Sequence, residues 1–84
     1  MPSNIWDAQN QVLQNMLKDL RKDANLTQLE LAGLLDKPQS YVSKYESGER
    51  RLDLIEIREI VTCCQSSLKK FVVEFDALVS DEEK

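Results

Sequence analysis

Apolar residues recur along the chain at intervals of three or four positions, in five separate segments. In the first, from about residue 6 to residue 24, they follow one face, namely Leu13, Met16, Leu17, Leu20 and Ala24. This spacing is typical of an amphipathic helix that buries one side. No stretch alternates apolar and polar residues with the period of two that a half-buried strand requires. The pattern therefore predicts an all-α fold, a compact five-helix bundle.

Capping residues predict where several of these helices begin. Thr27 and Glu30 have the spacing of a capping box, in which each side chain bonds the backbone N–H of the other residue. Asp53 and Ser67 are placed to cap the fourth and fifth helices. The later helices are expected at about residues 27–35, 39–47, 53–64 and 67–79, with residues 80–84 as a frayed tail.

Composition limits what such a bundle can do. A chain of 84 residues has room for a single domain, taken as residues 1–84. No apolar run exceeds three residues, so neither a membrane span nor a signal peptide is expected, and a cytoplasmic protein is the default. Because the chain has no histidine and its two cysteines are neighbours, Cys63 and Cys64, neither a zinc site nor a disulfide framework can hold it together. We expect no enzyme activity, no metal, no cofactor and no small-molecule ligand.

The polar face of the third helix carries the candidate chemistry. Two short helices joined by a turn of three or four residues are the arrangement that places a second helix in the DNA major groove. At about 100° per residue, one arc of the third helix is polar and free of acids, and it is formed by Gln39, Ser40, Ser43 and Lys44. Amide, hydroxyl and ammonium groups are the donors and acceptors that read base edges.

The surrounding residues resemble a known family. The motifs are Leu20-Arg21, then Leu26-Thr27-Gln28 and Leu31-Ala32, then the run Val42-Ser43-Lys44-Tyr45-Glu46-Ser47-Gly48-Glu49-Arg50-Arg51. Together they resemble the Cro/CI-type (XRE-like) helix-turn-helix proteins of phage repressors and small bacterial regulators, over about residues 17–78. The resemblance implies a lambda-repressor-like fold with its helix-turn-helix at about residues 28–47.

The resemblance also implies a role for individual residues. The family's base-facing positions are occupied by Gln39, Ser40, Ser43 and Lys44. Its DNA-backbone positions are occupied by Gln28, Ser47, Arg50 and Arg51. A pair that forms a largely buried salt bridge is matched by Arg21 and Glu46. Two further phosphate candidates come from the residues themselves: Lys37, equally suited to plain solvation, and the hydroxyl of Tyr41, whose ring is suited to packing.

A few positions depart from the family pattern. Asp36 stands where the turn usually has glycine, but Asp adopts a left-handed conformation at modest cost. Cys63 and Cys64 replace a small residue and leucine, and Gln65 replaces the glycine that follows, which affects the geometry between the fourth and fifth helices. The two thiols fit buried small residues better than a redox switch.

Charge is unevenly distributed along the chain. The net charge is -4, which is unfavourable for phosphate contact. Residues 37–51, however, carry four basic and two acidic side chains, whereas residues 52–84 carry four basic and eight acidic ones. The distribution predicts a basic recognition edge on an acidic body.

The fifth helix is the expected dimer contact. One recognition helix is too small to be selective, and two-fold dimers solve this by reading two half-sites about 34 Å apart. Leu68 and Val72 are assigned to the core, whereas four further apolar residues are assigned to a symmetric homodimer interface, namely Phe71, Phe75, Leu78 and Val79.

These observations favour a sequence-specific, nucleoid-associated regulator that binds double-stranded DNA. The expected form is a homodimeric repressor on a palindromic operator. An alternative is a protein-interaction module, such as an antitoxin-like or adaptor protein, that uses the apolar Leu29 and Leu34 and the fifth helix to bind another chain.

Overall fold

Helices make up most of the molecule. The computed structural model describes residues 5–82, with side chains described for residues 7–81. In that range the elements are α1 (Ile5–Asp23), α2 (Gln28–Leu35), α3 (Gln39–Ser47), α4 (Leu54–Cys63) and α5 (Leu68–Glu82), and residues 5–82 contain no strand. The all-α, five-helix fold predicted from the apolar spacing is confirmed.

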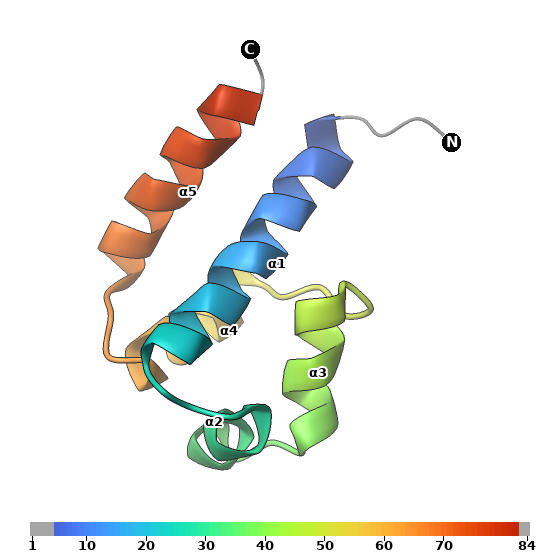
Figure 1. The fold of residues 1–84 in the computed structure, drawn as a ribbon, viewed down its shortest axis with the longest axis vertical. Helices are drawn as coiled ribbons and strands as arrows, with labels where there is room; N and C mark the ends of the chain where they lie inside the picture. The colour runs from blue at the N-terminus through green and yellow to red at the C-terminus, as the bar shows by residue number, and fades with distance from the viewer. Residues whose placement is uncertain (1–4, 83–84) are drawn as a thin grey trace.

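The helices divide into two packed groups. α1 and α5 lie side by side and run in opposite directions, so both ends of the described chain lie at the same end of the molecule (Figure 1). α2 and α3 pack on each other at the opposite end, where α3 also contacts α1. α4 contacts both α2 and α5 and so connects the two groups.

The capping residues act as the sequence predicts. Thr27 Oγ1 accepts a hydrogen bond from the Glu30 N–H at 3.0 Å, and Glu30 Oε1 accepts one from the Thr27 N–H at 2.9 Å. Asp53 and Glu56 form a second capping box at the start of α4, and Ser67 Oγ accepts from the Lys70 N–H at 3.1 Å at the start of α5. Local hydrogen bonds thus determine where these helices begin.

Left-handed residues end three of the helices without glycine. Asp36 has a φ of 59° at the end of α2, and Asn25 and Gln65 have φ values of 61° and 62° after α1 and α4. Short polar side chains such as Asp and Asn tolerate this conformation, and at Gln65 the tight connection between α4 and α5 imposes it. Gly48, with a φ of 90°, ends α3 as expected.

α5 is longer than the sequence pattern suggests. It continues to Glu82, beyond the expected end at about residue 79, and residues 83–84 lie outside the described range. The fraying expected for residues 80–84 stays a prediction. No glycine or proline interrupts residues 80–82, and Val79 is buried and anchors the turn before them.

The buried core corrects the assignment of α5 residues. Phe71 is 5% exposed and belongs to the central apolar cluster, and Val79 is 7% exposed, so the chain covers both residues itself. Val72, assigned to the core, is 45% exposed. Adjacent helical residues point about 100° apart, so only one of Phe71 and Val72 can face α1 and α4. Phe75 is half-buried and Leu78 is exposed, which leaves these two of the four predicted interface residues accessible.

The two neighbouring cysteines differ in environment. Cys64 is buried in the central cluster, and burial raises the pKa of its thiol to about 11. The thiol of Cys64 is therefore protonated at neutral pH and a poor nucleophile. Cys63 is half-buried, and its Sγ lies 4.0 Å from the carbonyl oxygen of Leu34. This environment favours the packing interpretation of the pair.

Candidate nucleic-acid interface

The polar arc of α3 faces away from the core. Val42 and Tyr45 on the other side of α3 are buried, and the Tyr45 ring packs edge-to-face on the Tyr41 ring at 5.6 Å between centroids. All four residues of the predicted base-facing set are exposed, namely Gln39, Ser40, Ser43 and Lys44. α3 is thus fixed by its apolar side and presents its acid-free side to solvent.

A buried ion pair joins α1 to α3. Arg21 Nε donates to Glu46 Oε2 at 2.7 Å and Arg21 Nη2 to Glu46 Oε1 at 3.1 Å, while Arg21 Nη1 donates to the Leu26 carbonyl at 2.8 Å. The two charged side chains are 9% and 4% exposed. Hydrogen bonding to Glu46 raises the pKa of Arg21, so the guanidinium stays charged. The salt bridge expected from the family resemblance is present in the fold.

Gln28 continues this network toward the exposed face. Its Nε2 donates to Glu46 Oε1 at 3.0 Å, and its Oε1 accepts from Gln39 Nε2 at a long 3.5 Å. A continuous chain of polar contacts therefore leads from buried Arg21 to exposed Gln39. The Glu46–Gln28 contact is absent from the sequence interpretation, although both residues belong to the recognised motifs.

A second polar cluster lies at the start of α4. Glu56 Oε2 accepts from Arg50 Nη2 at 2.6 Å and from the Tyr41 hydroxyl at 3.4 Å. The Arg50 guanidinium lies 4.9 Å from the centroid of the Tyr41 ring, and Lys37 Nζ lies 5.5 Å from the same centroid. The sequence predicts Lys37, Tyr41 and Arg50 as phosphate contacts. It does not predict that Glu56 lies beside them. The only signal was its place three residues after Asp53.

A hollow connects this cluster to the base-facing arc. Its volume is about 530 Å³, and it is lined by Pro38, Ser40, Tyr41, Lys44, Glu49, Arg50 and Arg51. It thus brings together two predicted base-facing residues and three predicted phosphate-facing ones. The remaining predicted residues lie outside its lining, namely Gln28, Lys37, Gln39, Ser43 and Ser47. The Ser47 hydroxyl donates to the Lys44 carbonyl at 3.0 Å and so completes the last turn of α3.

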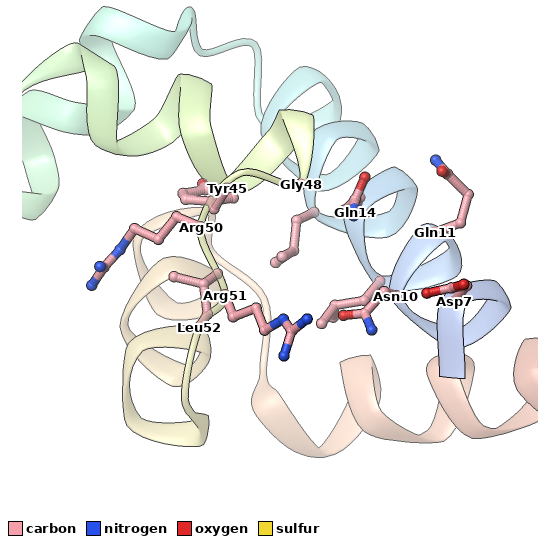
Figure 2. A pocket seen from close by; sticks show the side chains of 11 residues that line it. Asp7, Asn10, Gln11, Gln14, Tyr45, Gly48, Arg50, Arg51 and Leu52 are labelled. Carbon is pink, nitrogen blue, oxygen red and sulfur yellow. The ribbon is translucent and has the colours of Figure 1, made fainter. Parts of the chain in front are cut away.

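A second hollow lies on the other side of the linker between α3 and α4. It has a volume of about 590 Å³ and extends between the linker and α1 (Figure 2). Figure 2 shows the guanidinium of Arg51 turned toward Asn10 on α1, whereas Arg50 extends to the opposite side of the linker. Gly48 has a φ of 90°, a conformation that favours glycine, and a Cβ there would lie 2.7 Å from Gln14 Nε2, so the end of the Gln14 side chain would have to move aside.

Two features are absent from the described part of the chain. None of its helices is long and apolar enough to cross a membrane. Within the same residues, no three or more acidic or cysteine side chains are grouped so that they could hold a metal ion.

Two short packed helices, a tight turn between them and an exposed polar face on the second together define a helix-turn-helix domain. A family model described as helix-turn-helix matches residues 17–71, which is more than half of the chain. Among solved structures, the chain is similar to an XRE-family like protein from Pseudomonas syringae pv. tomato str. DC3000, with 38% sequence identity and a TM-score of 0.84. That match covers 88% of this chain and 90% of the other. The chain belongs to the XRE-like helix-turn-helix family.

Family membership makes the protein a DNA-binding transcription regulator by class, and this class is generally not enzymatic. A search of curated proteins found no match.

Proposed function

We propose that the protein is a sequence-specific transcriptional repressor that binds a palindromic operator as a homodimer. The observation that carries this proposal is the exposed, acid-free arc of α3, held in place by the buried Arg21–Glu46 pair. Gln39, Ser40, Ser43 and Lys44 are the base-reading residues of this proposal. As an operator-bound protein it acts in the cytoplasm, on the chromosome.

The DNA backbone is held from both ends of α3. Lys37, Tyr41, Arg50 and Arg51 supply the contacts around the hollow and the linker, Gln28 supplies one from the start of α2, and Ser47 supplies one from the end of α3. Phosphate contacts of this kind fix orientation, whereas base contacts from the arc provide sequence preference. Bound in the major groove, the domain represses by covering a promoter.

The amide of Gln39 has a specific preference in this arrangement. Its Nε2 donates to Gln28, which leaves Oε1 and one N–H of this exposed side chain available to a ligand. A glutamine that presents one acceptor and one donor pairs bidentately with adenine N6 and N7. We therefore assign to Gln39 an adenine in each half-site.

Homodimerisation supplies the second half-site. The accessible apolar residues on one side of α5 are Phe75, half-buried, and Leu78, 46% exposed. Reading two half-sites requires that a symmetric contact through this side place the two copies of α3 on one side of the dimer.

Selection of random duplex DNA on the purified protein, together with its mass in solution, tests the proposal. The expected result is a palindromic consensus with half-site centres about 34 Å apart, an adenine in each half, and the mass of a dimer. Binding that is weak, salt-sensitive and indifferent to sequence would contradict a role in operator recognition.

A second candidate function follows from α2. Leu29 and Leu34 are 64% and 58% exposed, which is unusual for leucines beside a DNA-facing helix. They suit a protein partner, as in an antitoxin-like or adaptor protein. Co-purification of a second chain that is lost on Leu29→Ser and Leu34→Ser substitution, together with sequence-indifferent DNA binding, would favour this function over the first.

A further inference from the structure

Glu56 uses its two carboxylate oxygens for two different purposes. Oε1 accepts from the Asp53 N–H at 2.9 Å, which completes the capping box of α4. Oε2 points to the linker, where it accepts from Arg50 at 2.6 Å and from the Tyr41 hydroxyl at 3.4 Å. Capping needs only the first oxygen. The contacts of the second oxygen therefore call for a separate explanation.

Both groups held by Oε2 belong to the hollow next to α3. Arg50 and Tyr41 line it together with Lys44 and Arg51, and the only carboxylate in its lining is that of Glu49. The guanidinium of Arg51 turns toward α1 (Figure 2), so the positive groups of this hollow are those of Arg50 and Lys44. The hollow therefore carries a surplus of positive charge and suits an anion such as a DNA phosphate. The side chain of Arg50 is 43% exposed toward solvent, whereas that of Glu56 behind it is 22% exposed.

The pair remains charged at neutral pH. The backbone N–H of Asp53 and then Arg50 lower the pKa of Glu56, and hydrogen bonding to Glu56 raises the pKa of Arg50. A full negative charge thus lies against the cation that is best placed to bind phosphate from the linker.

We propose that Glu56 shields Arg50 from DNA, acting as an internal substitute for phosphate that sets the affinity and the salt dependence of backbone binding. The inference rests on the proposed DNA-binding function. A phosphate in the hollow has to share the guanidinium with Glu56 or displace the carboxylate, and the carboxylate repels it in either case. Arg50 therefore contributes less to binding than an unpaired arginine in its place.

Glu56→Gln separates the two purposes of the side chain. Glutamine keeps an acceptor oxygen for the Asp53 N–H, as glutamine does in capping boxes, but it removes the negative charge. Glu59→Gln is the matched control, because Glu59 is an exposed residue one turn further along α4, outside the lining of the hollow, and the change in net charge is the same.

Binding of variants of the 84-residue chain to a duplex chosen by the selection experiment is measured over a series of KCl concentrations. Glu56→Gln is expected to bind several-fold more tightly near physiological salt, with a slope of log affinity against log salt steeper by about 0.9, the value for one added phosphate contact. Glu59→Gln is expected to change both quantities little. In a chain that already carries Arg50→Gln, Glu56→Gln is expected to have a much smaller effect, because shielding acts through Arg50 and only the direct repulsion between carboxylate and phosphate remains.

The outcomes distinguish this inference from the function on which it rests. If the wild-type chain binds no duplex, the proposed function fails and the inference fails with it. If the wild type binds and Glu56→Gln binds equally or more weakly, the inference alone is overturned. Arg50→Gln in the presence of Glu56 gives an independent test that leaves α4 unchanged. It should reduce the salt slope by less than about 0.5, roughly half a full contact, and a full loss would contradict shielding.

Discussion

The α2–α3 end of the molecule and the α1–α5 end differ in how far directional contacts add to apolar packing. At the first end, the capping box of α2 and the buried Arg21–Glu46 pair add directional hydrogen bonds to the packing of buried Val42 and Tyr45. At the second, α5 packs on α1 and α4 through apolar side chains such as Phe71. Directional contacts constrain orientation closely, whereas apolar packing mainly requires that volume be filled. The end that we propose reads DNA is therefore the one whose orientation is constrained more closely.

Truncating the buried ring of α5 has the largest expected effect. Phe71→Ala should lower the free energy of unfolding by about 3–5 kcal/mol, because it removes a large apolar group and leaves a cavity among α1, α4 and α5. Val72→Ala, on the adjacent exposed position, should change it by less than about 0.5 kcal/mol. Urea unfolding followed by circular dichroism measures both. Equal losses for the two variants would contradict the orientation of α5 described above.

Breaking the Arg21–Glu46 ion pair tests the contacts at the α2–α3 end of the molecule. Glu46→Ala leaves the Arg21 guanidinium buried without its carboxylate, and such losses cost about 3–5 kcal/mol. Glu49→Ala, on an exposed residue close by, should cost less than about 0.5 kcal/mol. Replacing both partners, as Arg21→Met with Glu46→Leu, should restore much of the stability, since the uncompensated charge is then gone. A double variant as unstable as Glu46→Ala would show that packing around the pair, rather than its charge, is decisive.

The same contrast explains what the sequence could predict. Capping boxes and the left-handed Asp36 are local, involving residues a few positions apart, and these predictions agree with the structure. The orientation of α5 depends instead on where α1 and α4 lie. Phe71 and Val72 are both apolar, so periodicity alone could not say which of them is buried.

The predicted interface shows the same limit. The exposed arc of α3 follows directly from helical periodicity, and family motifs are enough to suggest the Arg21–Glu46 pair. The contact between Glu56 and Arg50 depends on the path of the linker, which no short-range pattern encodes. For this reason the sequence predicts the Asp53 cap of α4 but not the ion pair between Glu56 and Arg50.

A base-reading side chain should matter for binding but not for folding. Lys44→Ala should weaken binding to the selected operator by about 1–3 kcal/mol and relax the sequence preference at one position of each half-site. Lys69→Ala removes the same charge from an exposed site on α5 and should leave the sequence preference unchanged. The affinity of each variant is measured on the selected duplex and on a scrambled duplex. An equal loss on the two duplexes would reassign Lys44 to the DNA backbone.

The smallest expected effect concerns the surface of α5, where only part of the apolar stripe remains available to a second copy. Leu78→Glu introduces a charge next to Phe75 and should raise the dimer dissociation constant at least about tenfold, or about 1.4 kcal/mol. Val73→Glu is the matched control, because Val73 is 63% exposed on the same helix, five residues and therefore about 140° away. Sedimentation equilibrium measures both constants, and thermal unfolding checks that each variant is folded. If Val73→Glu dissociates the dimer while Leu78→Glu does not, the interface lies on the other side of α5, and the two recognition helices are then placed differently with respect to the operator.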